Sequence, residues 1–283
     1  MLHSRAVSRF FKYHGLGNDF VVLDRRGGGG PIEPSRARAL CDRRRGIGAD
    51  GVLTILASGC APARMHVTNA DGSYAQMCGN GLRCVAKYLA DEAGIAGDEL
   101  PIETGNGVLA CRLHRGPDAR VAEVTIDMGR PELDAERIPM RAKGRFVARP
   151  IEVEGGRVTA TAVSMGNPHL VVFSPEIGMA RTLGPELEQN PLFPERTNVE
   201  LARREGEGLE VLVWERGCGI TEACGTGACA AMVAAVLEER LPAGEERPVR
   251  LPGGTLHIRV APDLSRVFMR GPAERVFEGD VAC

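Results

Sequence analysis

The sequence predicts an α+β protein of two similar halves, each a strand-rich sheet rolled around a central helix. Two pentapeptides, Met77–Gly81 and Ala223–Gly227, each place a cysteine before a Gly-x-Gly turn and a helical pattern, one in each half of the 283 residues. Two earlier segments, Gly17–Val22 and Gly166–Val172, each open with Gly-Asn and continue as a strand pattern. Because the segments recur in the same order, we interpret the chain as an internal duplication with a site between the halves.

Strand patterns outnumber helical patterns along the whole chain, which favours α+β over a doubly wound parallel sheet. We expect strands at Phe10–Tyr13, Phe20–Asp24, Val52–Leu56, Arg64–Thr68, Gly107–Leu113, Ala122–Asp127, Val158–Val163, Leu170–Phe173, Leu209–Glu215, Thr255–Val260 and Val267–Arg270. We expect helices at Pro34–Arg44, Asn80–Glu92, Leu183–Glu188 and Thr226–Glu239. Gly129 and Pro131 break the pattern between the halves. The predicted domains are therefore residues 1–127 and 128–270.

The two helices that follow the cysteines differ in character. Thr226–Glu239 is apolar on every face, so we expect it to be buried all round, whereas Asn80–Glu92 is amphipathic. Each Cys-Gly-x-Gly turn then lies at the N-terminus of a helix that its own half encloses.

Composition excludes several classes of function. The 35 Lys and Arg residues balance 37 Asp and Glu residues, which argues against a nucleic-acid or membrane partner. Nine scattered cysteines form no disulfide framework, and the chain has no apolar run long enough to span a membrane, so we expect reduced thiols in a cytoplasmic protein. The sequence has neither CxxC nor HExxH spacing, so we expect no metal. Met1–Arg9 is expected to be a disordered extension.

The Cys-Gly-x-Gly turns suggest proton-transfer chemistry. The first N–H groups of a helix lack partners and carry partial positive charge, so they can hold a carboxylate that glycines allow to approach closely. The same field lowers a thiol pKa from about 8.5 toward ~3.5–7.5. If two such ends face one α-carbon, one cysteine removes its proton and the other delivers a proton to the opposite side. A single cysteine here is more often a small buried hydrophobe. The duplication favours the reactive interpretation for Cys78 and Cys224 and leaves the hydrophobic one for the other cysteines.

Several segments make the chain resemble the diaminopimelate epimerases, members of a cofactor-independent two-cysteine racemase and epimerase superfamily. They occur in family order at Tyr13–Phe20, Asn69–Ser73, Met77–Cys84, Gly166–His169, Arg196–Val199, Trp214–Gly217 and Ala223–Cys229. The resemblance implies two α+β halves with the active site in the cleft between them, and it implies that residues 271–283 can pack back onto the first half. It also implies interconversion of LL- and meso-diaminopimelate, for lysine and peptidoglycan precursors, without pyridoxal phosphate or metal. A cytoplasmic homodimer is expected.

The resemblance implies a role for each matching residue. Cys78 and Cys224 would be the acid and base, and His169 and Glu215 would tune the thiol pair. Backbone amides of Gly79, Asn80, Gly225 and Thr226 would hold the carboxylate at the reacting carbon. The rest of the substrate would be bound by Asn18, Asn69, Asn167, Asn198, Glu215 and Arg216. Arg216 suits the distal carboxylate, and Glu215 suits the distal ammonium.

The chain departs from the family pattern at three positions, and two other functions remain open. Gly51 replaces a glutamine of some members, Ile220 replaces a glutamate, and Cys218 is an additional cysteine. A racemase of another amino acid, such as histidine, could use the same thiols. A non-catalytic amino acid binding relative would be expected to have lost one cysteine, and both are present.

Overall fold

The computed structural model describes residues 7–282, which divide into two compact units. Unit 1 comprises the residues up to Ile126 together with those from Gly271 onward, and unit 2 comprises Asp127–Arg270. The boundaries predicted from the sequence fall after residues 127 and 270.

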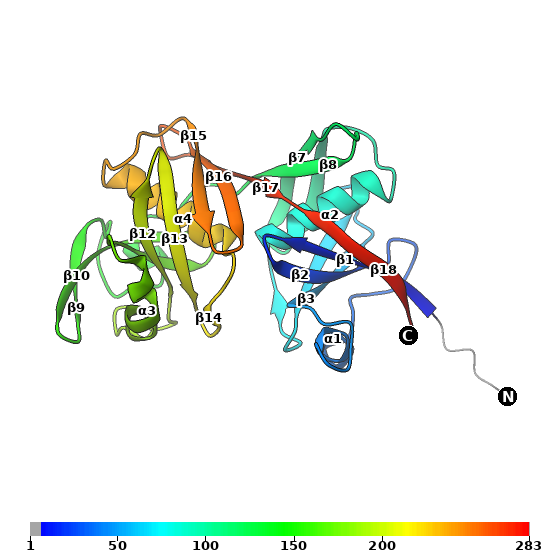
Figure 1. The fold of residues 1–283 in the computed structure, drawn as a ribbon, viewed down its shortest axis with the longest axis horizontal. Helices are drawn as coiled ribbons and strands as arrows, with labels where there is room; N and C mark the ends of the chain where they lie inside the picture. Colours follow the sequence, from blue (N-terminus) through cyan, green and yellow to red (C-terminus); the bar gives the residue numbers. More distant parts are fainter. Residues whose placement is uncertain (1–6, 283) are drawn as a thin grey trace. The chain divides into compact units, whose positions relative to one another are not determined.

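Unit 1 is a curved sheet with one long and one short helix (Figure 1). Its elements are β1 (Val7–Gly15), β2 (Asn18–Asp24), α1 (Pro34–Cys41), β3 (Gly51–Leu56), β4 (Arg64–Asn69), β5 (Tyr74–Ala75), α2 (Gly79–Asp91), β6 (Glu99–Thr104), β7 (Gly107–Arg115), β8 (Val121–Asp127) and β18 (Glu274–Ala282). The C-terminal strand β18 pairs antiparallel with β1, so the last residues of the chain complete the sheet that the first described residues begin.

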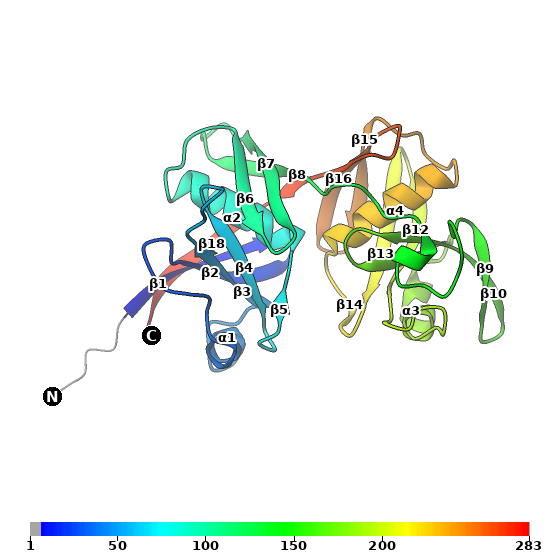
Figure 2. The same ribbon diagram turned by 180° about the vertical axis from the view of Figure 1, so that it is seen from behind.

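Unit 2 repeats this plan, and the view from behind shows α4 crossing its strands (Figure 2). Its elements are η1 (Ala135–Arg137), β9 (Arg149–Val153), β10 (Gly156–Ser164), β11 (Pro168–Phe173), η2 (Ile177–Met179), α3 (Ala180–Glu188), β12 (Asn198–Glu205), β13 (Gly208–Glu215), β14 (Gly219–Ile220), α4 (Gly225–Leu237), β15 (Glu246–Leu251), β16 (Gly254–Val260) and β17 (Val267–Pro272).

The two units share one order of strand pairing, so the duplication inferred from the motifs is visible in the fold. In unit 1, β1 pairs antiparallel with β2, β2 parallel with β3, and β3 antiparallel with β4. In unit 2, β10, β11, β12 and β13 pair in the same directions. A short hairpin strand then leads into the long helix of each unit. The predicted α+β class is confirmed.

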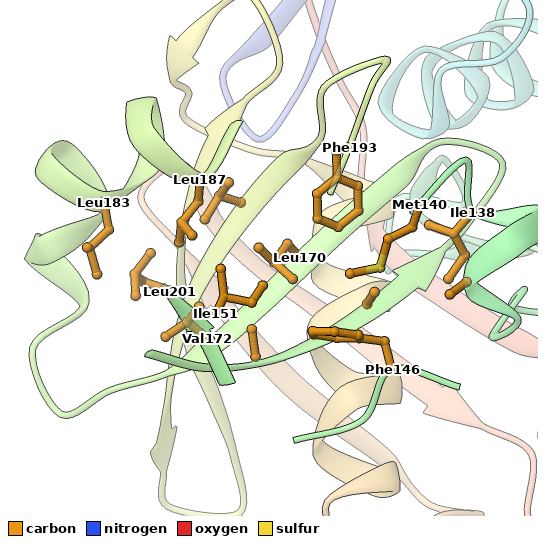
Figure 3. Packing of buried hydrophobic residues seen from close by; sticks show 14 of the residues in the cluster. Ile138, Met140, Phe146, Ile151, Leu170, Val172, Leu183, Leu187, Phe193 and Leu201 are labelled. Carbon is orange, nitrogen blue, oxygen red and sulfur yellow. The ribbon is translucent and has the colours of Figure 1, made fainter. Parts of the chain in front are cut away.

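In both units the central strands carry a helix on each face, because successive strand residues point to opposite sides. On β12, Val199 and Leu201 belong to the apolar cluster that includes Leu183 and Leu187 of α3 (Figure 3). Glu200, between them, instead lies against Gly227 of α4. In unit 1, Val21 of β2 and Val52 of β3 pack in the cluster of α1. The neighbouring Leu53 lies against Gly81 of α2. Each cysteine-bearing helix therefore packs on the face of the sheet that the short helix leaves open.

The two long helices are both deeply buried, and for α2 this burial exceeds what its sequence pattern predicts. Most of α4 is buried, as its apolar sequence requires. The predicted amphipathic character of α2 is misleading, because Arg83 and Lys87 are buried as well. Lys87 Nζ donates to Asp91 Oδ2 at 2.9 Å and to the carbonyl of Val121. Polar residues on one face of a helix therefore do not always mark a solvent-exposed face, because hydrogen-bond partners inside the protein can allow them to be buried.

Several predicted boundaries were wrong for local reasons. Helix α1 ends at Cys41 instead of Arg44, because Asp42 Oδ1 accepts the N–H groups of Arg44 and Arg45 and turns the chain. Strands β6 and β15 were missed because each contains a proline, which weakens a strand pattern. Strands β5, β9, β12, β14 and β18 were also missed. In the predicted extension Met1–Arg9, the last three residues belong to β1, and residues 1–6 lie outside those described.

The cysteines outside the two turns divide into two groups. Cys41, Cys84, Cys111 and Cys229 are buried, as expected of small hydrophobes. Cys60 and Cys218 are exposed, so the hydrophobic interpretation is wrong for both, and Cys283 lies outside the described residues. Every helix formed by residues 7–282 is too short or too polar to span a membrane.

Candidate active site

The first half-site, in unit 1, is built on the N-terminus of α2. Cys78 is the N-cap residue of α2, with extended backbone, and its Sγ accepts the N–H of Gly81 at 3.4 Å. An N-terminal backbone donor and the helix dipole both stabilise negative charge on this sulfur. The turn residues Gly79 and Asn80 follow directly, so their backbone N–H groups belong to the first turn of the helix, where the expected carboxylate would bind.

A series of hydrogen-bonded side chains, beginning at the buried Arg83, positions this half-site. Arg83 is fully buried, and its guanidinium donates to Asn80 Oδ1 and to the carbonyl of Pro272, both at 3.0 Å. Asn80 Nδ2 in turn donates to Asn18 Oδ1 at 3.2 Å. The same Asn18 oxygen lies 3.9 Å from Cys78 Sγ. The buried cation thus sets the position of two predicted site residues and, through them, of the thiol.

The other predicted residues of unit 1 lie at strand ends with polar partners. Asn18 begins β2 and donates to Asp50 Oδ2 at 2.8 Å. Asn69 ends β4, and its Nδ2 donates to Ser73 Oγ at 2.9 Å. At Gly51, an added Cβ would stand 2.9 Å from the carbonyl oxygen of Thr68, so the side chain that some relatives carry there needs a local shift of this backbone.

The second half-site, in unit 2, is built on the N-terminus of α4. Cys224 is its N-cap residue, with Sγ 3.5 Å from Thr226 Oγ1. Its thiol is more enclosed than that of Cys78, with only 6% of the residue exposed. Burial raises the pKa of Cys224 well above its ordinary value, and the carboxylates of Glu215 and Glu200 raise it further. The expectation that the helix terminus lowers this pKa is therefore wrong for Cys224, because loss of water and two nearby carboxylates outweigh the helix dipole.

His169 is the second residue of β11, and Asn167 directly precedes this strand; His169 connects Asn167 to Glu200 of β12. His169 is fully buried; its Nδ1 lies 2.7 Å from Glu200 Oε1, and its Nε2 lies 3.0 Å from Asn167 Oδ1. Both ring nitrogens thus face oxygen acceptors. His169, expected to tune the thiol pair, is therefore hydrogen-bonded to Glu200, a residue that was not among the predicted site residues.

The loop between β13 and β14 carries the residues expected to bind the distal end of the substrate. Glu215 Oε1 accepts a hydrogen bond from Thr221 Oγ1 at 2.5 Å. Arg216 Nη1 donates to the carbonyl of Glu195 at 3.0 Å. Asn198 Oδ1 accepts the N–H of Arg216 at 2.9 Å, and Asn198 Nδ2 donates to the carbonyl of Pro168 at 2.8 Å. The buried amide of Asn198 therefore holds this loop against β11.

A second carboxylate supports the same loop and was also missed. Glu188, at the end of α3, accepts the indole N–H of Trp214 at 2.8 Å and the N–H of Gly217 at 2.9 Å. The sequence did carry a signal for Glu200, which interrupts the apolar alternation of Val199–Ala202. It carried one for Arg83 as well, which follows Asn80 by one helical turn.

Comparison with known proteins identifies the family. The sequence profile described as diaminopimelate epimerase matches residues 10–133 and 161–276. The chain belongs to the diaminopimelate epimerase family. It is 48% identical to the diaminopimelate epimerase of Synechococcus sp. (strain JA-3-3Ab), over 96% of this chain and 98% of that protein. It is 47% identical to the diaminopimelate epimerase of Moorella thermoacetica, with the same coverage.

Solved structures show a shared fold at much lower sequence similarity. A hydroxyproline epimerase from Agrobacterium vitis superposes with a TM-score of 0.71 at 16% identity, over 97% of this chain and 91% of that chain. A phenazine biosynthesis protein of Bacillus anthracis superposes with a TM-score of 0.68 at 15% identity, over 98% of this chain and 100% of that chain. At these identities the likeness concerns the architecture, which supports the α+β assignment.

Proposed function

We propose that this enzyme interconverts LL- and meso-diaminopimelate by proton transfer between two thiols, in the biosynthesis of lysine and peptidoglycan precursors. The observation that carries the proposal is the pair of N-cap cysteines, Cys78 on α2 and Cys224 on α4, in units that share one topology. Family membership supports the substrate, because the relatives at 45–48% identity carry this name.

In the proposed reaction the two half-sites bind opposite sides of one α-carbon. Cys78, as thiolate, removes the α-proton, and Cys224, as thiol, donates its proton to the other side, so carbon inverts and the thiol and thiolate exchange places. The high pKa of Cys224 supports its role as donor. The backbone N–H groups of Gly79, Asn80, Gly225 and Thr226 would hold the carboxylate, whose negative charge increases in the transition state. The chemistry uses no cofactor and no metal.

The distal amino acid head would be bound by polar groups of both units. Arg216 would pair with the carboxylate and Glu215 with the ammonium group. Asn18, Asn69 and Asn167 would donate and accept hydrogen bonds at the substrate's polar atoms. For Asn198 we propose an indirect contribution, because both ends of its amide already bind backbone groups.

The test is exchange of the α-proton in D₂O with reductant present, followed by NMR. We expect exchange and epimerisation of diaminopimelate by the unmodified enzyme, and neither activity in Cys78→Ala or Cys224→Ala. The matched controls are Cys84→Ala and Cys229→Ala, which remove a buried thiol from the same two helices and should leave turnover largely intact. Substantial turnover by either N-cap variant contradicts the two-thiol scheme. Exchange of histidine but not of diaminopimelate assigns the enzyme to a different racemase.

We further propose that the enzyme is a cytoplasmic homodimer, as the family resemblance implies. Size-exclusion chromatography with light scattering measures the mass in solution, and fractionation of the source cells tests the compartment. A monomeric mass at full activity would exclude an obligatory dimer.

A further inference from the structure

The two half-sites differ in the residue that lies behind the cysteine. In each long helix the third residue after the cysteine is a glycine whose missing side chain leaves room for a residue of the sheet. A Cβ added at Gly81 would stand 2.8 Å from Leu53 Cδ2 and 3.6 Å from Cys78 Cβ. A Cβ added at Gly227 would stand 2.8 Å from Glu200 Oε1 and 3.3 Å from Cys224 Sγ. One thiol thus has a leucine behind it and the other has a glutamate.

Strand register shows that these two residues occupy equivalent positions. In the parallel pair of unit 1, Leu53 lies beside Val22, two residues after Phe20. In the parallel pair of unit 2, Glu200 lies beside Val171, two residues after His169. Phe20 of unit 1 therefore corresponds to His169 of unit 2, and Leu53 corresponds to Glu200. All four side chains are buried, so an apolar pair in one half corresponds to a hydrogen-bonded ionisable pair in the other.

The ionisable pair is costly to bury, which calls for a reason beyond packing. Glu200 is fully enclosed, and its Oε2 has no hydrogen-bond partner among the described residues. Burial raises the pKa of Glu200, and the bond to His169 counters that effect. A buried ion pair can often be replaced by apolar residues without loss of stability, and unit 1 already holds such residues at the equivalent positions. Stability alone therefore gives no reason for Glu200.

We propose that Glu200 is a positioning residue that makes the two thiols unequal. Its Oε1 fixes the ring of His169, which in turn orients Asn167, and its carboxylate keeps Cys224 in the protonated form across the gap left by Gly227. In unit 1 the equivalent position is occupied by Leu53, so no carboxylate at that position opposes a thiolate on Cys78. The inference rests on the proposed two-thiol reaction and explains how the resting enzyme assigns one thiol as donor.

The groups that face Cys224 come from three strands packed against α4. They are Glu200 on β12 and Glu215 on β13, whose carboxylates raise the pKa of the thiol, and His169 on β11, which reaches the thiol through its hydrogen bond to Glu200. The charged side chains of the other strands on α4 are engaged with partners of their own, as for Arg157, Arg247, Arg250 and Arg259. Glu246 pairs with Arg270, and His257 is the remaining titratable residue of β16. Removal of the Glu200 charge should therefore act on Cys224 directly.

The experiment compares Glu200→Gln with the unmodified full-length enzyme. Alkylation of Cys224 by iodoacetamide is followed by peptide mass spectrometry over a neutral to alkaline pH series. The carboxylate disfavours the thiolate, so its removal should shift the alkylation profile of Cys224 to lower pH by about one unit. At a pH where labelling is still increasing, this shift corresponds to about ten-fold faster alkylation. The basic limb of kcat/KM should move in the same direction, whereas KM should change little, because the amide oxygen of glutamine can still accept from His169 and hold Asn167 in place. The matched control is Glu238→Gln, which neutralises a carboxylate of low exposure just beyond the other end of α4 and should move neither profile.

A second variant guards against a failure to fold. The double variant His169→Phe and Glu200→Leu places in unit 2 the pair that unit 1 already buries. We expect it to fold with near-normal thermal stability and to lose most activity, a combination that a purely structural role does not predict. An unshifted Cys224 profile in folded Glu200→Gln, or full activity of the double variant, overturns the proposal. If neither variant folds, the alkylation profile of Cys224 in the unmodified enzyme provides the test. A profile that rises at the same pH as that of an ordinary thiol, or at lower pH, also refutes the proposal.

The alkylation measurement needs no turnover, so it separates the two proposals. If the unmodified enzyme does not exchange the α-proton of diaminopimelate, the proposed function is refuted, whereas the effect of Glu200 on the alkylation of Cys224 is still tested. An unchanged Cys224 profile with normal epimerisation would refute only the role of Glu200.

Discussion

The glycine at the third position after each cysteine provides the sharpest mutational test of the half-sites. In Gly227→Ala the new Cβ would stand 2.8 Å from Glu200 Oε1 and 3.3 Å from Cys224 Sγ. A carbon closer than 3.0 Å forces a movement, and Glu200 cannot retreat without lengthening its 2.7 Å contact with His169. The substitution therefore displaces either the thiol or the carboxylate that faces it.

The effect on stability and the effect on activity should differ in size. Overpacking costs ~1–3 kcal/mol, and alanine in a helix interior regains about 1 kcal/mol over glycine, so the net loss should be about 0–2 kcal/mol. For a chain of this size that lowers Tm by only a few degrees, at roughly 2–4 °C per kcal/mol. Misplacement of a reacting group by about 1 Å costs about 10²-fold in rate. We therefore expect a folded protein with kcat/KM reduced by about two orders of magnitude.

The assay is α-proton exchange in D₂O beside a thermal melt of the same preparation. Gly81→Ala is the comparator, because its Cβ meets a methyl group of Leu53 at the same 2.8 Å. A methyl group can rotate aside without loss of a hydrogen bond, so Gly81→Ala should keep more activity. Full activity of Gly227→Ala, or a larger loss in Gly81→Ala, would refute the reasoning.

Two further predictions concern unit 1. Arg83→Met should lower the free energy of unfolding by about 1–3 kcal/mol, the cost of leaving buried acceptors unpaired, and should reduce kcat/KM through Asn80 and Asn18. Denaturant titration and proton exchange measure the two effects, and unchanged activity in a folded variant would exclude a positioning role. Burial alone would raise the pKa of Asp19, but hydrogen bonds from Arg43 and Lys12 and their charges lower it to about 2. Because this folded pKa lies below the unfolded value of about 3.9, the stabilisation is fully present above that value and is lost as pH falls toward 2. Asp19→Asn should therefore lower the free energy of unfolding by about 1–2 kcal/mol near neutrality, after allowance for solvent screening. Denaturation measured over an acidic pH series should show the stabilities of the variant and the unmodified enzyme converging. A stability difference that does not depend on pH would contradict this role of Asp19.

The sequence was most informative where local pattern and chemistry coincide. The N-cap positions of Cys78 and Cys224, the buried α4 and the duplicated strand order all follow from short segments read by themselves. The family resemblance supplied the substrate and the polar residues that we propose to bind it. What these signals share is that each depends on residues close together in the chain.

The elements that were missed depend on distant partners. Strand β12 carries a glutamate among apolar residues, and it is a strand because β11 and β13 pair on its two sides. Strand β18 is largely exposed, and its pairing with β1, far away in the sequence, makes it part of the sheet. Likewise, Arg83 can be buried because the carbonyl of Pro272, far along the chain, accepts its hydrogen bond. No local pattern reveals these partners, and Cys224 shows the same limit, since its pKa depends on carboxylates from two other strands.

The pairing of β18 with β1 has a consequence for how the chain reaches its folded state during synthesis. Unit 2 is one continuous segment, so it can fold as soon as it leaves the ribosome, whereas the sheet of unit 1 waits for the last strand to be translated. Until then, the β1 edge that Val7–His14 presents is an unpaired strand, the kind of surface that recruits other chains. Early termination or C-terminal proteolysis should thus damage the half that was made first, and nascent chains stalled before Glu274 should depend most on chaperones.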